Sequence, residues 1–444
     1  MMSTRYDVLV IGAGVAGLQA GRVLAEAGQR VAIVEARGRI GGRIWSRPIS
    51  LDNSQRRIPI ELGAEFIHGL PAETWSLIRQ AELSTFEIDG SSFWFDGSQL
   101  MTANEQPWAA ERVLEEMTRR MQKQPSGSDM SFAEYLKGQA LDPLTARAAS
   151  NYVEGFNAAD QYCISVAALA KQQAAEDAIA ADRLFRLEAG YAAVPNFLAE
   201  KFMAAGGMLI FEAPVKKIVW KRDAVSVETT GRHGDLSYHS TRAVITVPLA
   251  VLQAQTIEFV PRPTEVLFHA NRLKMGAVVR LTLVFKQKFW DRSLSFLFAP
   301  GESPPTWWTP VPHEAPLLTA WAGGPKAELL LNLITADGDA GALRDQSLST
   351  LAKIFKLPPS DIRQMLSSWH MHNWQSDTYA RGAYSYVPVG ALDAPAKMRI
   401  PVEDTLYFAG EHTDIAGHWG TVHAALAAGA GVADKIIAAG RGGS

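Results

Sequence analysis

Cysteine is almost absent from this sequence: Cys163 is the single one among 444 residues. An intramolecular disulfide is therefore excluded, and the composition fits a reducing compartment. Charge of one sign is also lacking, because 43 Lys and Arg face 46 Asp and Glu, for a net charge of −3. No bulk basic field therefore favours nucleic acid as a partner.

Long apolar runs are missing too. No stretch of about 18 uninterrupted apolar residues occurs, so we expect no transmembrane segment. Residues 1–5 are too short for a signal peptide, because the first apolar run follows them directly. With the single cysteine, these absences predict a cytoplasmic protein. They leave its oligomeric state open.

Metal-binding patterns are the next absence. The ten histidines show neither H-x-x-x-H nor H-x-x-E-H spacing, and the lone cysteine has no partner. His370 and His372 flank Met371, which places both on one face of a strand. We expect them to pack beside Trp369 and Trp374, and we expect no metal site.

The first third of the chain opens with a nucleotide-binding pattern. An apolar run rich in β-branched residues at 6–11 enters a G-x-G-x-x-G turn, an Ala- and Leu-rich helix follows, and a second strand at 31–34 ends at Glu35. The first glycine permits the tight turn, the second lets backbone amides approach a pyrophosphate, and the third lets helix and strand pack closely. These glycines are Gly12, Gly14 and Gly17. Strand, turn, helix and acid agree, so we predict dinucleotide binding.

A basic, glycine-rich loop directly after Glu35 indicates which dinucleotide binds. Residues 37–43 read Arg-Gly-Arg-Ile-Gly-Gly-Arg, and such a loop can wrap a buried diphosphate. The block resembles the second signature of the flavin amine oxidase superfamily. The resemblance implies FAD, with Glu35 on the adenosine ribose, Arg37 in contact with the cofactor and Arg43 near the flavin. No second G-x-G-x-x-G follows a strand, which disfavours a separate NADPH site.

The end of the chain resembles the C-terminal flavin motif of the same superfamily. Residues 406–413 form a strand-like run that ends in Gly410 and Glu411. By the resemblance, Glu411 bonds the ribityl chain. The helix that begins near Thr421 and Val422 directs its positive end at the N1/O2 edge of the flavin, where it stabilises the reduced anionic form.

Residues 61–69, Glu-Leu-Gly-Ala-Glu-Phe-Ile-His-Gly, resemble a segment of animal-type polyamine oxidases, with Phe66 in place of the usual Trp. By this resemblance His68 lies in the substrate channel, where it binds or deprotonates an ammonium group. The same likeness implies cofactor contacts from other positions along the chain: Gly63, Ala64, Glu65, Phe66, Val215 and Trp374.

Residues 374–388 resemble a segment that polyamine oxidases share with the related histone-lysine demethylases. The resemblance makes Tyr384 one wall of the pocket that faces the flavin. Monoamine oxidases tether their flavin through a cysteine one position earlier, where this chain has Ala383, so we expect non-covalent FAD. Monoamine oxidases also supply a second cage tyrosine, and the matching place here, residues 421–425, reads Thr-Val-His-Ala-Ala, which resembles the polyamine oxidase and demethylase branch. We assign Thr421 to the catalytic pocket.

Arg280 departs from the family pattern. It stands where the family carries a lysine that holds a water against flavin N5 and is tied to fast reaction with oxygen. Arginine does not give up its proton, and it presents a fork instead of a point charge. Arg280 is therefore a catalytic candidate that leaves the rate of O₂ reoxidation open and admits another electron acceptor.

Periodicity suggests an interleaved chain. We expect helices near 108–124, 131–139, 142–159 and 164–180, a loop at 125–128, and strands at 208–211, 215–220, 224–229, 243–247, 278–285, 329–334 and 405–409. The resemblance implies an α/β fold: a Rossmann-like FAD-binding domain of discontinuous segments, with an inserted α+β substrate-binding domain. We assign 1–78, 205–277 and 395–444 to the former. The latter takes 79–204, mainly helical, and 278–394, which is β-rich.

The resemblance covers nearly the whole length and predicts an FAD-dependent amine oxidase. A hydride passes from the carbon α to an amine to flavin N5, the imine hydrolyses to an aldehyde or ketone, and O₂ reoxidises the flavin with release of H₂O₂. We favour a polyamine such as spermidine or spermine. Its distal ammonium groups would find partners among three acids that are as well explained as structural: Glu61, Glu65 and Glu154.

Other substrates and another class stay open. An L-amino acid oxidase of the same fold needs an arginine to clamp the carboxylate, and Arg183, Arg186 or Arg381 would serve. A monoamine oxidase is a further alternative. A flavin-binding protein with little oxidase turnover is the alternative of another class, which Arg280 would permit.

Overall fold

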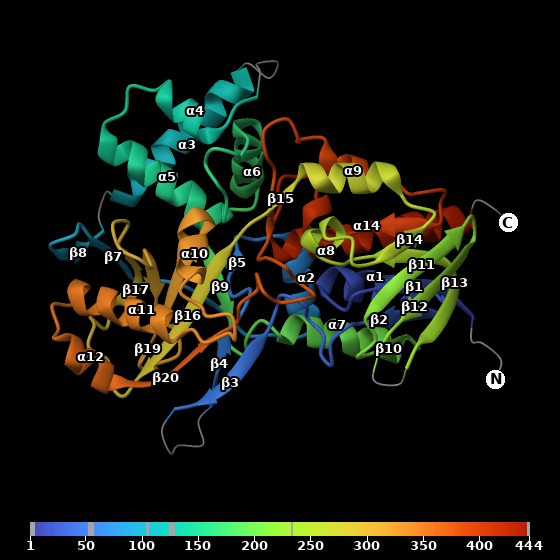
Figure 1. Cartoon of the computed structure of the whole chain (residues 1–444), viewed down its shortest axis with the longest axis horizontal. Helices are drawn as coiled ribbons and strands as arrows, with labels where there is room; N and C mark the ends of the chain where they lie inside the picture. The colour runs from blue at the N-terminus through green and yellow to red at the C-terminus, as the bar shows by residue number, and fades with distance from the viewer. Residues whose placement is uncertain (1–4, 52–56, 104–105, 124–128, 232–233, 442–444) are drawn as a thin grey trace.

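Two β-sheets built from interleaved stretches of the chain organise the molecule (Figure 1). The computed structural model describes residues 5–51, 57–103, 106–123, 129–231 and 234–441. The first sheet has the order β10-β2-β1-β13-β12-β11-β14, and β22 also pairs with β13. Its strands are β1 (Arg5–Ile11), β2 (Val31–Val34), β10 (Met208–Ile210), β11 (Val215–Lys221), β12 (Ala224–Thr229), β13 (Leu236–Ile245), β14 (Glu258–Val260) and β22 (Leu406–Phe408).

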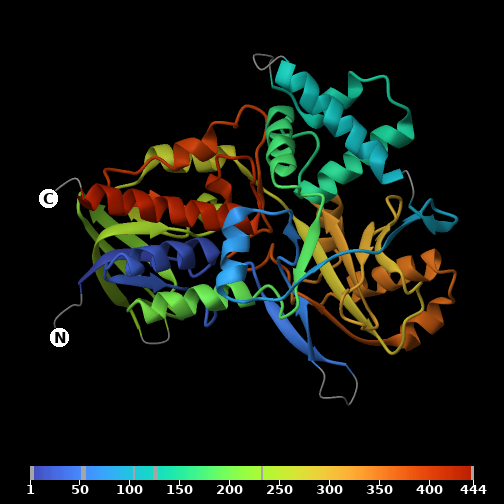
Figure 2. The ribbon, with the colours of Figure 1, turned by 180° about the vertical axis from the view of Figure 1, so that it is seen from behind.

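Part of this sheet is parallel, because β10, β2, β1, β13 and β22 all pair in that sense. The apolar runs of β2 and β22 are buried on both faces, as is usual for parallel strands. Helices α1 (Val15–Glu26), α7 (Ala193–Ala204) and α14 (Val422–Arg441) form one covering layer, with α1 in the middle (Figure 2). Helices from the two ends of the chain therefore pack side by side.

Helix α14 is, within the described ranges, the one helix long and apolar enough to cross a membrane, over Val422–Gly440. Half of that stretch is buried inside the molecule. Its contact with α1 is so close that a Cβ at Gly429 would collide with the carbonyl oxygen of Ala16. Core helices commonly meet the same criteria of length and composition, so this is weak support for a membrane span.

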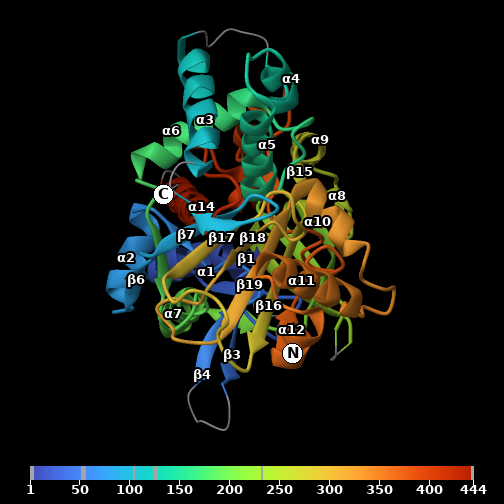
Figure 3. The same cartoon turned by 90° about the vertical axis from the view of Figure 1, so that its left-hand side faces the viewer.

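The second sheet has the order β20-β16-β19-β18-β17-β7-β8, and helices α10, α11 and α12 pack on it (Figure 3). Strand β16, between β20 and β19, is buried along its whole length. The elements are β7 (Ser91–Phe95), β8 (Leu100–Thr102), β16 (Val278–Phe285), β17 (Leu294–Phe298), β18 (Thr306–Trp308), β19 (Leu317–Gly323), β20 (Leu366–Met371), α10 (Gly324–Leu331), α11 (Gly341–Ile354) and α12 (Pro359–Met365).

A separate helical cluster lies beside the second sheet, at the top of Figure 1. It comprises α3 (Gln106–Lys123), α4 (Phe132–Lys137), α5 (Pro143–Asn157) and α6 (Val166–Ala178). Short elements complete the chain: β3 (Ser46–Ser50), β4 (Arg57–Glu61), β5 (Ile67–His68), β6 (Thr85–Glu87), β9 (Leu184–Leu187), β15 (Lys274–Met275), β21 (Ser385–Tyr386), α2 (Ala72–Gln80), α8 (Leu249–Gln253), α9 (Thr264–Arg272), α13 (Ala394–Met398) and the 3₁₀ turn η1 (Glu411–Thr413).

Most predicted elements are confirmed, including the four helices and the strands at 208–211, 215–220, 224–229 and 278–285. The strand predicted at 329–334 is wrong. Residues 329–331 end helix α10, which a proline in its first turn starts, and a short apolar run cannot by itself separate helix from strand. The loop predicted at 125–128 lies outside the described residues. The predicted range 79–204 places helix α7 in the substrate domain. In the structure α7 packs against α1, in the hydrophobic core beside the first sheet.

Candidate active site

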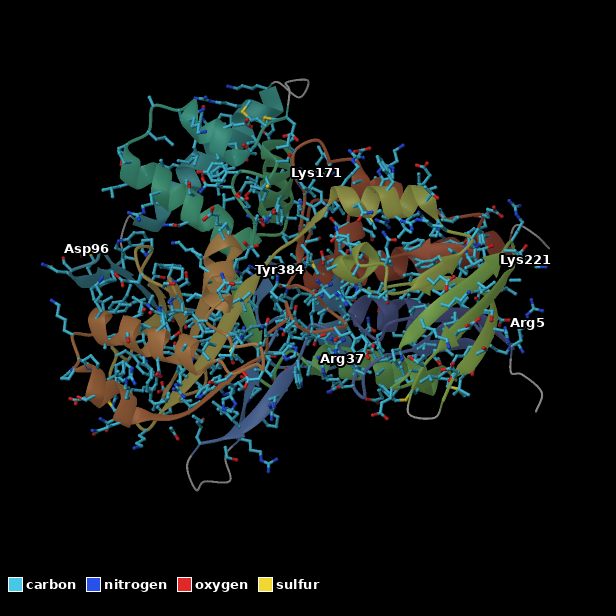
Figure 4. All side chains as sticks on the ribbon, viewed as in Figure 1. Arg5, Arg37, Asp96, Lys171, Lys221 and Tyr384 are labelled. Carbon is cyan, nitrogen blue, oxygen red and sulfur yellow. The ribbon has the colours of Figure 1, made fainter. Side chains whose placement is uncertain are left out.

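A large cavity of about 1460 Å³ lies where the first sheet, the second sheet and the helical cluster meet. Every residue that the sequence assigned to cofactor binding or to catalysis lines it except Gly17. Figure 4 shows Arg37 and Tyr384 in this central region of the molecule, on either side of which the two sheets extend. Residues separated by more than 400 positions in the chain, such as Gly12 and Thr421, therefore face one space.

The glycine turn forms one end of the cavity. Gly14 is the N-cap of α1 and pairs with Gly41 in a short bridge, so both glycine-rich loops make one wall. A Cβ at Gly14 would meet nothing within 4 Å, because it would enter the cavity. A Cβ at Gly17 would collide with the carbonyl oxygen of Gly12. Gly17 therefore serves packing, while Gly14 leaves room beside the backbone amides of the helix start.

Glu35 joins the turn to the basic loop. One carboxylate oxygen accepts a hydrogen bond from Ala13 N, and the other accepts one from Arg37 N, both at 2.8 Å. Each oxygen retains a further lone pair for a ribose hydroxyl. The guanidinium of Arg37 pairs with Asp377 and lies over the ring of Tyr379. Arg37 and Tyr379 both line the cavity. Val215 also lines the cavity, at the same end.

Glu411 ties the N-terminal and C-terminal motifs together. Its carboxylate accepts from Arg43 Nη1 at 2.8 Å, from Ser385 Oγ at 2.5 Å and from Gly420 N at 3.1 Å. Burial acts to raise the pKa of Glu411, but the Arg43 charge and these donors hold it below its ordinary value. Arg43 also donates to Ala383 O at 2.7 Å. The sequence assigned Glu411 to the ribityl chain, whereas in the structure its oxygens also organise the surrounding loops.

The start of helix α14 faces the same space. Thr421 is its N-cap, since Thr421 Oγ1 accepts from Ala424 N at 3.2 Å and donates to His418 O at 2.7 Å. Val422 follows as the first helical residue, and both line the cavity. The positive end of a 20-residue helix thus points where negative charge would be stabilised. Gly410, at φ 145°, lies nearby in the loop before η1.

Aromatic rings form the other part of the cavity. The Tyr384 hydroxyl donates to Phe156 O at 2.7 Å, and burial raises the pKa of Tyr384. Phe66 makes an edge contact with Trp308 at a centroid distance of 5.3 Å, and Tyr152 stacks on Phe156 at 5.5 Å. Sequence reasoning missed Tyr152, Phe156 and Trp308, because only the fold brings these helix and strand residues beside the motif positions.

His68 lies among these rings, with its own ring 5.6 Å from that of Phe156. Burial lowers the pKa of His68 to about 4, so its imidazole is neutral near pH 7. A neutral imidazole accepts a hydrogen bond from an ammonium group but does not retain the proton at that pH. Two further histidines, His418 and His423, line the cavity, although the sequence did not single them out. Their ring centroids are 4.6 Å apart.

Arg280 lies in the wall of the cavity and is firmly held. Its guanidinium pairs with Glu65 and donates to Gly63 O at 3.2 Å. The other oxygen of Glu65 pairs with Arg186 at 2.7 Å, and Trp308 Nε1 donates to Glu65 at 2.9 Å. The Glu65 carboxylate, which the sequence offered to the cofactor or to a distal ammonium, is therefore fully engaged.

Carboxylates gather on the side of the cavity formed by α3, α5, α6 and the β5-β9-β6 sheet. Five of the seven are exposed, which places them at the opening. Burial raises the pKa of Glu176 to about 7. Arg183 on this side is paired with Glu87 at 2.6 Å. The seven acids are Glu87, Glu111, Glu115, Glu154, Glu176, Asp177 and Asp182.

Two of the three acids that the sequence proposed for distal ammonium groups lose that role. Glu61 does not line the large cavity, because its oxygens turn to Ser46 and to the backbone of Tyr191. Glu65 is engaged by two arginines. Glu154 lines the cavity and accepts from Gln161 at 2.9 Å, so it is the one of the three that keeps acceptor capacity for a ligand there.

The residues fit FAD. The open space at Gly14 and the helix start beside it suit a pyrophosphate, and the Glu35 carboxylate, which keeps acceptor capacity, suits a ribose hydroxyl. Trp374, which donates to Leu62 O at 2.7 Å, positions the segment that holds Gly63 and Ala64. For metals, the described ranges contain no group of three or more His, Cys, Asp or Glu placed to hold an ion.

Comparisons with known proteins agree with this geometry. A family model for flavin containing amine oxidoreductases matches residues 15–437. Polyamine oxidase 2 of Arabidopsis thaliana is 29% identical, over 96% of this chain and 87% of the relative. Lysine-specific histone demethylase 2 of Homo sapiens is 27% identical over 97% of this chain, which spans 53% of that relative.

Solved structures share the fold. Putrescine oxidase, in its wild-type form bound to putrescine, aligns with a TM-score of 0.82 at 22% identity, covering 98% of this chain and 99% of the other. Cyclohexylamine oxidase from Brevibacterium oxydans IH-35A aligns with a TM-score of 0.81 at 21% identity, covering 99% and 100%.

Proposed function

Because the chain belongs to the flavin containing amine oxidoreductase family, we propose that it is an FAD-dependent oxidase of polyamines such as spermidine or spermine. Flavin binding and amine oxidation are inferred from the family membership. The acidic opening of the cavity is the observation that supports a substrate with several positive charges. Seven carboxylates line that side of the cavity, five of them at its opening, against two basic residues, Arg183 and Lys326. A field of this sign raises the local concentration of cationic substrates.

The aromatic part of the cavity suits the methylene chain of such a substrate. Phe66, Trp308 and the stacked pair of Tyr152 and Phe156 exclude water and leave apolar faces for CH₂ groups. Tyr384 is held in one orientation by its bond to Phe156 O, so its ring limits the approach of the amine carbon. Orientation and desolvation of the amine are thus the contributions of this chain.

Bound FAD supplies the hydride acceptor. His68, neutral by burial, accepts a hydrogen bond from the incoming ammonium group, and bulk solvent takes the proton that the amine must lose. The amine then gives its α hydride, and the imine that leaves is hydrolysed to an aldehyde or ketone. O₂ accepts the two electrons together with two protons and is released as H₂O₂.

The cofactor is non-covalent in this proposal, because the methyl group of Ala383 offers no attachment atom. Its contacts come from the discontinuous segments that build the first sheet and its helices. The second sheet and the helical cluster form the substrate-binding domain. A cytoplasmic location stays a prediction from composition.

A peroxide-coupled assay of the purified yellow protein tests the proposal. The substrates are spermidine, spermine, putrescine, phenylethylamine and a set of L-amino acids. We expect H₂O₂ from the polyamines, with a KM that rises with ionic strength as the acidic field is screened. Turnover of phenylethylamine or of amino acids alone would overturn the polyamine assignment. If no substrate gives H₂O₂ although flavin is still bound, a flavin-binding protein with little turnover would be favoured.

The structure gives little support to an amino acid substrate. Of the three arginines considered as a carboxylate clamp, Arg183 is paired with Glu87 and Arg186 with Glu65. Arg381 lines neither the large cavity nor the small one described below. We therefore favour amines without a carboxylate.

A further inference from the structure

A second, much smaller cavity lies behind the wall of the large one. Its volume is about 30 Å³, which is room for a water molecule or two. Arg280 and Glu65 line both cavities, whereas Arg186 and Glu61 line the small one and not the large one. Arg280 and Glu65 are thus part of the partition, and Arg186 and Glu61 stand behind it.

The cluster formed by Arg186, Arg280 and Glu65 carries a net positive charge. Arg186 and Arg280 both pair with Glu65, so two guanidinium groups share one carboxylate. The Arg186 and Arg280 side chains are only 8% and 6% exposed. Arg186 Nη2 and Arg280 Nε have no hydrogen-bond partner among the described residues. Buried charges of this kind are normally neutralised or solvated, so the excess charge acts on whatever the two cavities hold.

Glu61 can change this charge near neutral pH. Burial raises its pKa to about 7, against the lowering effect of the hydrogen bonds from Ser46 Oγ and Tyr191 N. When Glu61 is protonated, the cluster carries +1. When Glu61 is ionised, its charge cancels that excess. The titratable and charged groups that face Glu61 are Glu65, Arg186, Tyr191, Arg280 and His313.

We propose that Arg186 and Glu61, from behind the partition, set the charge that Arg280 presents to the large cavity and thereby the reduction potential of the FAD bound there. Glu65 alone would cancel the charge of Arg280, and Arg186 restores it. Positive charge near a bound flavin favours the electrons of the reduced state and so raises the potential. The inference depends on flavin binding and not on which amine is the substrate.

The first test compares midpoint potentials of the holoenzyme, measured against reference dyes, in Arg186→Met and Arg186→Lys. We expect a more negative potential in Arg186→Met and a potential near wild type in Arg186→Lys, which keeps the charge. Arg30→Met is the matched control, because it removes a cation from an exposed pair with Asp7. Equal shifts in the Met and Lys variants would mean a packing role, and no shift in Arg186→Met would overturn the charge argument.

The second test uses Glu61→Gln, whose amide oxygen can still accept from Tyr191 N while its NH₂ group can donate to Ser46 Oγ. Wild type and variant should share one potential at acidic pH, where both side chains are neutral. They should diverge as the pH rises through about 7, with the wild type more negative, because only its Glu61 ionises. Potentials that stay parallel over the whole range would overturn the proposal. This test stands even if Arg186→Met does not fold, and neither test involves substrate turnover.

Discussion

Gly14→Ala should separate cofactor binding from folding. Gly14 has φ −71° and ψ 173°, an extended conformation that any residue adopts. A Cβ there would meet no heavy atom within 4 Å. The apo-protein should therefore fold as before. Its free energy of unfolding should stay within about 1 kcal/mol of wild type, because alanine restricts the unfolded chain more than glycine does but is the poorer N-cap.

The affinity for FAD, in contrast, should fall. The new methyl group enters the space beside the backbone amides at the start of α1, where the pyrophosphate is expected. Loss of one hydrogen bond to a charged group costs about 1.5–3 kcal/mol. Since about 1.4 kcal/mol corresponds to a factor of ten, FAD affinity should fall about 10-fold to about 100-fold.

Titration of the apo-protein with FAD, followed by quenching of flavin fluorescence, measures the affinity, and thermal unfolding without FAD measures the fold. Gly301→Ala is the matched control, because its Cβ would also enter open space but outside the large cavity. Gly17→Ala should behave differently and destabilise the apo-protein, since its Cβ would collide with Gly12 O. Unchanged FAD affinity in Gly14→Ala, or an unfolded apo-protein, would refute the reasoning.

Three further variants test other parts of the site. Tyr384→Phe leaves Phe156 O without its donor, so thermal unfolding should show a loss of about 0.5–1.5 kcal/mol while FAD stays bound; an unchanged melting temperature would contradict this. Asp177→Asn with Asp182→Asn should raise the KM for spermidine, flatten its dependence on salt and leave kcat unchanged. An equal rise in the KM for an uncharged amine would show that the acidic residues do not act on the substrate through their charge. Glu65→Gln should destabilise the protein by about 3–5 kcal/mol in urea unfolding, because two buried guanidinium groups lose their carboxylate, and a loss below about 1 kcal/mol would contradict the buried cluster.

The nucleotide end of the site could be predicted from sequence because its signals are local. A glycine turn between an apolar strand and a helix is set by a dozen neighbouring residues, and the structure places Gly12 and Gly14 at the cavity and Gly17 in helix packing. Strand and helix periodicity likewise depends on near neighbours. It failed at 329–334, where a short apolar run is compatible with both elements.

The substrate end could not be predicted to the same extent. Tyr152, Phe156 and Trp308 carry no motif, and they reach the cavity because α5 and β18 pack beside residues from the first hundred positions. The acidic opening is likewise assembled from separate helices and loops. Its members look like ordinary surface carboxylates in the sequence, where nothing indicates that they face one space.

Arg280 illustrates why a residue's type and place in a motif do not determine its effect. The sequence shows an arginine where the family has a lysine, which suggests a simple change of donor geometry. In the structure its charge is first cancelled by Glu65 and then restored by Arg186, two residues 215 and 94 positions away in the chain. The electrostatic character of the wall is a property of the whole cluster. A replacement at position 280 must therefore be interpreted together with Glu65, Arg186 and the protonation state of Glu61.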